Sequence, residues 1–271
     1  MSLVETDWLE KNLDRVKIID CSWHMPKSNR NGFEEYKLQH IPYSIFFDLD
    51  KNSKKDSHLP HMLVEKEDWE KIVSKMGIEN NDEIIVYDNS DVISSCRCWF
   101  NFIYFGHDPK LIHILNGGLK KWIKEKRKIT QDIPQIKFTN YKSSKKKDLV
   151  KNKEFIDANI ETKKFKVIDA RSKERFEGKV PEPRIGLRSG SIENSFCMPF
   201  SNCLNPDKTF KNNKELKNIF ESYVKNIDEK NIVFSCGSGV TACVLALAYS
   251  LINDKYQPCI YDGSWAEYGL I

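Results

Sequence analysis

The chain has 271 residues, with 40% hydrophobic residues, 30% charged residues and a formal net charge of +4. This length fits one large domain or two ordinary ones, and the hydrophobic share is sufficient to build a core. Charges of opposite sign nearly cancel and no apolar run is long enough for a membrane helix, so we expect neither a nucleic acid nor a membrane as partner. The first residues show no secretory or transit pattern, which favours a cytoplasmic location.

The eight cysteines do not follow a metal-binding pattern. Cys96 and Cys98 are too close in sequence for a zinc knuckle and no histidine cluster accompanies them, so we expect no metal ligands. In a reducing compartment the cysteines stay free thiols, and most of them fill space in the core. All six histidines lie at or before His113, so a histidine that assists the second half must come from far away in sequence.

An internal repeat is the first sign of the domain organisation. Four segments of the first half recur in the second half, in the same order and with a period close to half of the chain. The pairs are Lys17–Ser22 with Lys166–Arg171, His40–Asp48 with Ser191–Phe200, Ile84–Asp88 with Ile232–Cys236, and Leu115–Trp122 with Tyr261–Trp265. Four matches in order indicate a duplicated domain, and the long period excludes a solenoid.

Short β-branched runs alternate with helical patterns in each half. In the second half, the pattern predicts strands over 165–168 and 231–235, a helix over 213–224, and an apolar, deeply packed helix from about 240 to 252. Strands that alternate with helices are typical of an α/β fold with a mainly parallel sheet flanked by helices on both faces.

A polar stretch separates the two halves. It covers residues 139–153 and contains the lysine run 145–147, which is more typical of a solvated connector than of a binding patch. We therefore predict an N-terminal domain over 1–138, a linker over 139–153 and a C-terminal domain over 154–271.

The strongest chemical signal is the segment Cys236-Gly-Ser-Gly-Val-Thr-Ala242, between a predicted strand and the buried helix. Gly237 and Gly239 let the backbone curl so that its N–H groups form an anion-binding nest, and the following helix adds its N-terminal partial positive charge. A cysteine in this setting is expected to be a thiolate at neutral pH, and the same N–H groups can hold the outer sulfur of a persulfide. The alternative is a buried cysteine beside a turn that only begins a helix.

This loop resembles the active loop of the 3-mercaptopyruvate sulfurtransferases, which belong to the tandem rhodanese superfamily. Similar segments run along essentially the whole chain: Asp20–Trp23, His40–Pro42, Phe46–Asp50, His61–Leu63, Asp169–Arg171, Arg175–Phe176, Pro181–Arg184 and Tyr261–Trp265. The resemblance implies two tandem rhodanese-like domains, of which the first is inactive, with Asp88 at the position of the nucleophile, and the second is catalytic. It implies a transferase without a cofactor, which moves the sulfur of 3-mercaptopyruvate through a persulfide of Cys236 to a thiol or cyanide and releases pyruvate.

The resemblance also implies which residues bind the substrate. Arg175 and Arg184 hold its carboxylate and ketone, and a planar, permanently charged guanidinium is well suited to that task. The structural alternative for each arginine is a surface ion pair with one of the nearby glutamates. The remaining substrate-binding positions are those of the loop: Gly237, Gly239, Val240 and Thr241.

A proton relay is implied as well. Cleavage of the carbon–sulfur bond leaves pyruvate as an enolate, and Ser238, backed by His61 and Asp50, is placed to supply the proton. The structural alternatives are a packed histidine at position 61 and a turn carboxylate at position 50.

One segment departs from the pattern of the family. Asn89–Trp99 is shorter than its usual counterpart and has Cys96 where the family has proline. The range of sulfur donors that the site accepts therefore does not follow from the resemblance.

Three other functions compete with this prediction. A thiosulfate sulfurtransferase on the same scaffold typically has basic residues after the cysteine, whereas Gly237, Ser238 and Gly239 are neutral. A cysteine phosphatase needs an arginine to close the loop, and none follows here. A non-enzymatic rhodanese module for protein contacts would not need Cys236. We expect a small anionic sulfur donor and a thiol acceptor such as thioredoxin or a small thiol.

Overall fold

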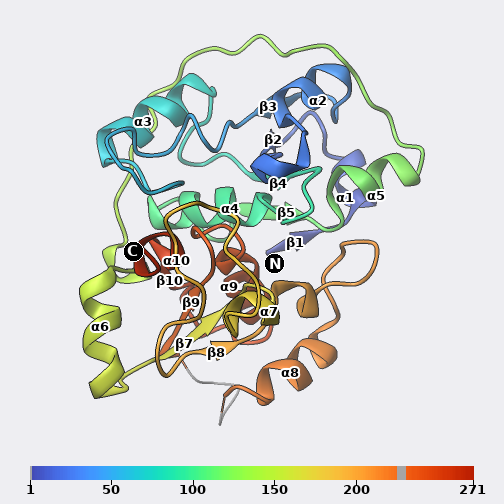
Figure 1. Ribbon diagram of the computed structural model, residues 1–271. Coiled ribbons are helices and arrows are strands. Elements are labelled where there is room, and N and C mark those ends of the chain that lie inside the picture. Colours follow the sequence, from blue (N-terminus) through green and yellow to red (C-terminus); the bar gives the residue numbers. More distant parts are fainter. Residues whose placement is uncertain (1, 225–229) are drawn as a thin grey trace. The chain divides into compact units, whose positions relative to one another are not determined.

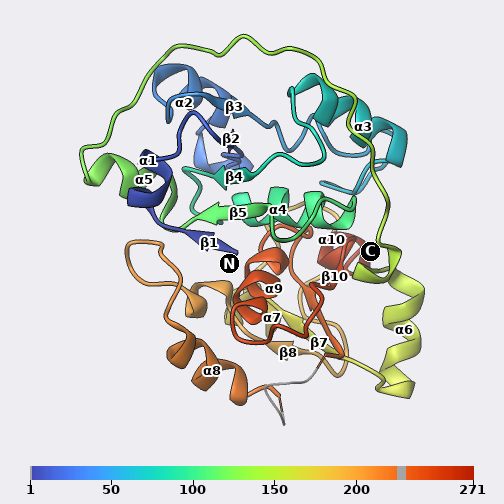
Figure 2. The same ribbon diagram turned by 180° about the vertical axis from the view of Figure 1, so that it is seen from behind.

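The computed structural model describes residues 2–224 and 230–271, which form two compact units. Unit 1 comprises the residues up to Lys55, Leu63–Lys146 and Pro206–Thr209. Unit 2 comprises Asp56–Met62, Lys147–Asn205 and Phe210–Ile271. Each unit is an α/β structure with its own sheet, and each is described by itself (Figures 1 and 2).

The sheet of unit 1 is parallel throughout and has the order β1-β5-β4-β2-β3. Its strands are β1 (Leu3–Val4), β2 (Lys17–Asp20), β3 (Ser44–Phe46), β4 (Ile84–Tyr87) and β5 (Ile112–Leu115). Every residue of β4 and β5 is buried, as expected for inner strands of a parallel sheet that helices cover on both faces.

The helices of unit 1 bury apolar residues at helical spacing. They are α1 (Thr6–Glu10), the 3₁₀ turn η1 (Pro26–Ser28), α2 (Gly32–Leu38), α3 (Lys66–Lys75), α4 (Ser95–Tyr104) and α5 (Gly118–Lys124). In α3, for example, Trp69 and Val73 lie one turn apart and both are buried. Figures 1 and 2 also show the chain after α5 running around the outside of this unit, past α2 and α3.

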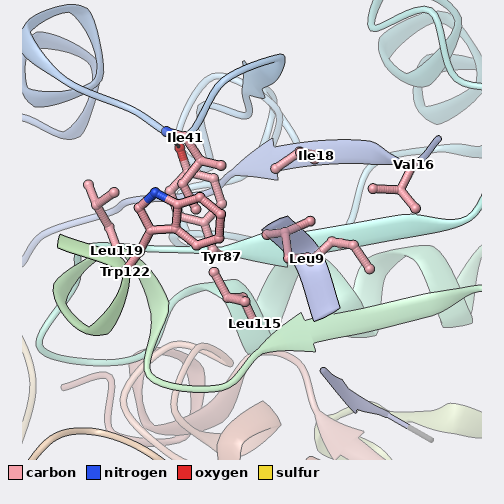
Figure 3. Close-up of a cluster of buried hydrophobic side chains, with 9 residues drawn as sticks. Leu9, Val16, Ile18, Ile41, Tyr87, Leu115, Leu119 and Trp122 are labelled. Carbon is pink, nitrogen blue, oxygen red and sulfur yellow. Dashed lines mark hydrogen bonds between the residues drawn. The ribbon is translucent and has the colours of Figure 1, made fainter. Parts of the chain in front are cut away.

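A cluster of buried side chains joins the sheet of unit 1 to α1 and α5 (Figure 3). Its largest members are Tyr87 and Trp122, which are both fully buried. The hydroxyl of Tyr87 accepts a hydrogen bond from the N–H of Ile41 at 3.2 Å and lies 2.9 Å from Oγ of Ser44, so its polar end is not left without a partner.

The sheet of unit 2 repeats this topology, with the order β6-β10-β9-β7-β8 and parallel pairing throughout. Its strands are β6 (Val150–Lys151), β7 (Lys166–Asp169), β8 (Phe196–Cys197), β9 (Ile232–Ser235) and β10 (Ile260–Tyr261). The helices and 3₁₀ turns are η2 (Lys147–Leu149), α6 (Lys153–Thr162), α7 (Lys173–Phe176), η3 (Phe200–Cys203), α8 (Asn213–Glu221), α9 (Ala242–Ser250) and α10 (Ser264–Tyr268).

The predicted α/β class and the parallel sheets are confirmed. The predicted strands correspond to β7 and β9, and the predicted helices correspond to α8 and α9. Both helices are shorter than predicted by a few residues. Helix α8 begins where the side chains of Asn212 and Glu215 cap it reciprocally, and α9 is buried from Ala242 to Tyr249, as its apolar sequence predicts.

The structure differs from the prediction of a plain connector over 139–153. Its first part packs on unit 1, where the N–H and hydroxyl of Thr139 bond to carbonyls of Ser74 and Ile78 and where Tyr141 is buried. Its last part forms η2 and the edge strand β6 of unit 2. The polar composition reflects exposed lysine side chains, whereas the backbone between them pairs with the units.

Among residues 2–224 and 230–271, no helix is long and apolar enough to cross a membrane, and no group of three or more potential metal ligands occurs.

Candidate active site

Cys236 directly follows β9, an inner strand of unit 2, and its side chain is almost fully buried at 1% exposure. The carboxyl end of a parallel strand is where open α/β sheets usually bind ligands. From Cys236 the chain turns through five residues and enters α9 at Ala242, so the cysteine lies in a loop between a buried strand and the N-terminus of a buried helix.

The loop exposes backbone N–H groups that no internal hydrogen bond uses. Gly239 has φ +73°, a conformation that a residue with a Cβ rarely adopts, and it turns the chain into the helix. Among the described residues, the N–H groups of Gly237, Ser238, Val240 and Thr241 have no acceptor. Together with the partial positive charge at the start of the nine-residue α9, they form a setting that favours an anion.

Helix α10 holds the loop from the other side. The N–H of Trp265 donates to the carbonyl of Cys236 and the N–H of Ala266 donates to that of Gly237, both at 2.9 Å. The carbonyl groups of Cys236 and Gly237 are therefore directed toward α10, and the N–H groups of Gly237, Ser238, Val240 and Thr241 stay available for an anion.

The two predicted substrate-binding arginines lie over Gly237. A Cβ atom at this position would come within 3.2 Å of Nη2 of Arg175 and 3.8 Å of Nη1 of Arg184. Gly237 does not have a positive φ, so glycine serves here to leave room for the guanidinium groups rather than to permit an unusual backbone. The structure thus brings Arg175, Arg184 and the cysteine loop together in unit 2.

The structural alternative for Arg175 holds in part, because it forms an ion pair with Glu182. Its Nε and Nη2 donate to the two carboxylate oxygens, and the side chain of Glu182 is 1% exposed. The same carboxylate accepts from Nη1 of Arg171 at 2.8 Å. Glu182 therefore links a structural arginine to one at the site.

Arg171 has a structural place. Its guanidinium bonds to Asp169 and Glu182 and lies 4.4 Å from the ring centre of Trp265. Burial alone would lower the pKa of Arg171, but the two carboxylates raise it above its ordinary value. Arg188 stacks on the same ring, with its guanidinium 4.6 Å from the ring centre.

Ser238 connects the loop to a histidine of the first half of the sequence. Its Oγ lies 3.0 Å from Nδ1 of His61, 177 positions away in sequence, and accepts from Nη2 of Arg184 at 3.3 Å. His61 is buried and has φ +62°. It reaches Ser238 because its segment, Asp56–Met62, packs with unit 2 although it precedes most of unit 1 in sequence.

Asp50, the third predicted member of the relay, belongs to unit 1. Both oxygens of its carboxylate accept from the indole N–H of Trp23, at 3.0 and 3.1 Å. Its place at the end of the relay stays a prediction.

In unit 1, the position of the nucleophile is taken by Asp88. Its carboxylate accepts from the N–H groups of Ser90 at 2.7 Å and Ser95 at 2.9 Å, so the loop after β4 already holds an anionic group of its own. Burial raises the pKa of Asp88, and these hydrogen bonds offset part of the effect. A carboxylate offers no sulfur nucleophile.

Sequence reasoning missed two residues of the site. Glu182 is one of the glutamates close to the two arginines in sequence, and its burial is not visible in a polar stretch. Ser264 lies in a matched segment of the repeat but received no role. Its hydroxyl contacts the nucleophile loop, and the only signal for this was the glycine at the equivalent position of the first half, Gly118.

Comparisons with known proteins identify the family of the chain. The model of the rhodanese-like domain matches residues 5–125 and 152–270. The chain therefore belongs to the rhodanese-like family and contains two such domains. It is a sulfurtransferase, the enzyme class of its curated relatives.

Relatives with both donor names align over almost the whole chain. It is 37% identical to thiosulfate/3-mercaptopyruvate sulfurtransferase 1 of Arabidopsis thaliana over 98% of this chain and 75% of the relative. It is 33% identical to human 3-mercaptopyruvate sulfurtransferase and 35% to bovine thiosulfate sulfurtransferase, each over 98% of this chain and 91% of the relative. Among solved structures, SseA of Escherichia coli, described under 3-mercaptopyruvate sulfotransferases, has a TM-score of 0.87 at 30% identity and covers 98% of this chain and 100% of its own.

Proposed function

We propose that Cys236 takes sulfur from 3-mercaptopyruvate and carries it as a persulfide. The observation that carries this proposal is the pair of guanidinium groups over Gly237, next to the buried cysteine. A 2-oxo acid presents a carboxylate and a ketone oxygen, and planar donors at this place suit both.

The first step is an attack of the Cys236 thiolate on the sulfur of 3-mercaptopyruvate. An S–S bond forms while the C–S bond breaks, and its electron pair leaves on carbon as the enolate of pyruvate. The outer sulfur first keeps the thiol proton of the donor. When it gives up this proton, the N–H groups of Gly237, Ser238, Val240 and Thr241 stabilise its negative charge. The enolate takes a proton at carbon and becomes pyruvate.

We assign the delivery of this proton to Ser238. Its hydroxyl bonds to His61 and receives a hydrogen bond from Arg184, which lies over the same glycine as Arg175. A serine that contacts both a substrate-binding arginine and a histidine is suitably placed for general acid catalysis. Asp50 is the proposed third member of the relay.

In the second step, a thiolate or cyanide attacks the outer sulfur of the persulfide. The S–S bond breaks, its electron pair returns to Cys236 as thiolate, and the sulfur leaves as a new persulfide or as thiocyanate. We propose a thiol acceptor, either thioredoxin or a small thiol. The experiment is to offer each to the isolated persulfide form and to follow loss of the added sulfur by mass spectrometry.

Thiosulfate is the second candidate donor, because relatives with that name align equally well. A dianion is favoured by basic side chains within the loop, and this loop has neutral residues between Cys236 and α9. The test is to compare pyruvate release from 3-mercaptopyruvate with thiocyanate formation from thiosulfate and cyanide, using one preparation. Faster turnover of thiosulfate would reverse the assignment.

We further propose that residues 154–271 form the catalytic domain and residues 1–138 an inactive one, since Asp88 replaces the nucleophile in unit 1. A purely non-enzymatic module is disfavoured by Cys236, whose loop keeps N–H groups available.

We propose that the protein works in a reducing compartment, because all eight cysteines are free thiols. The sequence favours the cytoplasm as this compartment. One relative is named as mitochondrial, so cell fractionation decides between the two.

A further inference from the structure

Ser264, the first residue of α10, has an unfavourable backbone conformation. Its φ is +49°, in the left-handed region, and its side chain is fully buried. Residues with a Cβ are rare in this region, and where they occur the surroundings must hold them there. A serine at this position therefore needs a reason that glycine would not satisfy.

Unit 1 shows the same turn with the residue that the backbone prefers. Gly118 occupies the equivalent position with φ +56°, and the N–H of the next residue, Leu119, donates to the carbonyl of Asp88. In unit 2 the N–H of Trp265 donates to the carbonyl of Cys236 in the same way. The turn itself can thus be built with glycine, and the hydroxyl of Ser264 is what unit 2 adds.

This hydroxyl makes three hydrogen bonds. Its Oγ accepts from the N–H of Cys236 at 3.1 Å and from the N–H of Gly239 at 3.2 Å, and it donates to the carbonyl of Tyr261 at 2.8 Å. One buried atom thus joins the first and fourth residues of the nucleophile loop to the end of β10. The loop between these two points is closed around a single acceptor.

We propose that Ser264 is a positioning residue for the sulfur-transfer reaction. By drawing the N–H groups of Cys236 and Gly239 to its own oxygen, it fixes the curl of the loop that leaves the N–H groups of Gly237, Ser238, Val240 and Thr241 for the sulfur. This role rests on the proposed function of Cys236 and deepens it. Ser264 acts through the loop and is not itself assigned a contact with the substrate.

Two variants separate this role from a purely structural one. Ser264→Ala removes the hydroxyl and keeps the strained backbone, whereas Ser264→Gly removes the hydroxyl and relieves the strain. We expect a lower melting temperature for Ser264→Ala than for Ser264→Gly. Ser250→Ala is the matched control, because its hydroxyl also bonds to a backbone carbonyl, that of Ala246, but at the far end of α9.

Two measurements are made on each variant: the single-turnover rate of persulfide formation at Cys236 with 3-mercaptopyruvate, and the rate of Cys236 alkylation by iodoacetamide against pH. Both Ser264 variants should form persulfide roughly tenfold more slowly, since two buried donors lose their acceptor. Their alkylation profiles should move to higher pH, because the loosened loop stabilises the thiolate less. The Ser250 control should match the unchanged protein in both.

Unchanged rates and profiles in both Ser264 variants would overturn the proposal. So would full recovery in Ser264→Gly, since the hydroxyl would then only compensate for strain. If the unchanged protein forms no persulfide at Cys236, the proposed function fails instead. The alkylation profile needs no sulfur donor and still tests whether Ser264 organises the loop.

Discussion

Both carboxylate oxygens of Glu182 accept hydrogen bonds from the guanidinium of Arg175, and Glu182 itself is buried. Glu182 therefore holds the orientation of Arg175 at the site, and it shares its carboxylate with Arg171. Arg184 also lies over Gly237, but the hydrogen bond of its guanidinium goes to Ser238. The two arginines are thus not equivalent, and their removal should have different effects.

Arg184→Ala should weaken the use of 3-mercaptopyruvate by about 2 kcal/mol in kcat/KM, because a charge-assisted hydrogen bond to the carboxylate is lost. Arg175→Ala should do the same and also lower the free energy of unfolding, by about 1 kcal/mol, since buried Glu182 loses one of its two arginine partners. The measurements are steady-state kinetics with each donor and urea unfolding.

The control for this pair is Arg188→Ala, which removes a guanidinium that stacks on Trp265 in the same unit. It should leave the preference between 3-mercaptopyruvate and thiosulfate unchanged. Equal losses on both donors in the Arg184 variant would show that this arginine supports the fold rather than recognising a carboxylate.

Cys236→Ser should abolish turnover and leave the fold intact, because a hydroxyl neither ionises at neutral pH nor forms a persulfide. Mass spectrometry after treatment with the donor should find one added sulfur on the peptide that contains Cys236. Cys197→Ser is the control, because Cys197 is only partly buried, whereas the other seven cysteines are buried. Burial and the nearby Asp169 raise the pKa of its thiol to about 11, so it should be unreactive at neutral pH. Added sulfur on Cys197 in an active Cys236 variant would contradict the assignment.

Asp20 and Asp169 lie at equivalent strand ends of the two units, and replacing each with asparagine should change the free energy of unfolding in opposite directions. Asp20 ends β2 and Asp169 ends β7, but only Asp169 has an arginine partner, Arg171. Burial raises the pKa of Asp20 from 3.8 to about 7, although hydrogen bonds from Ser22 lower it in part. Between these pH values the folded chain holds a proton that the unfolded chain releases. The contribution of Asp20 to the free energy of unfolding is therefore complete below about pH 3.8 and is lost as the pH rises through about 7.

Asp20→Asn should consequently raise the free energy of unfolding at pH 8 by about 1 kcal/mol or more, and the gain should vanish near pH 4. Asp169→Asn should instead lower it at pH 8 by about 3 kcal/mol, because Arg171 is left buried with less negative charge around it. Urea unfolding at both pH values measures these differences. A destabilised Asp20 variant at pH 8 would show that its hydrogen bonds outweigh the cost of burying its charge.

Much of the fold could be predicted because the repeat and the alternation of strands and helices are local patterns. The two sheets with equivalent strand orders follow from duplication, and the apolar sequence of α9 predicts its burial. The exchange of Asp56–Met62 into unit 2 could not be predicted, since it depends on packing between segments that are distant in sequence. The same holds for β6, whose two residues become a strand only through pairing with β10.

At the site, the cysteine loop and the two arginines could be proposed from motifs, whereas the groups that hold them could not. Glu182 and Ser264 are defined by burial and by the atoms they meet. The left-handed backbone of Ser264 is indicated only by its repeat partner Gly118, because serine itself is not a residue that usually indicates this conformation. Positions that act through hydrogen bonds to backbone are visible only once the chain is folded.

The proton relay is tested by His61→Asn and Asp50→Asn. Asparagine tolerates the positive φ of His61, so the first change removes the imidazole without opposing the backbone. Oδ1 of the new residue at position 50 can still accept from Trp23, so the second change removes the charge alone.

If His61 and Asp50 deliver the proton through Ser238, single-turnover release of pyruvate should slow roughly tenfold or more in each variant. The alkylation rate of Cys236 against pH should not change, because the loop N–H groups and the start of α9 favour the thiolate. His58→Asn, in the same segment but exposed, is the control and should behave as the unchanged protein. Unchanged pyruvate release in both variants would reduce His61 and Asp50 to structural residues and leave the Ser238 hydroxyl or water as the proton source.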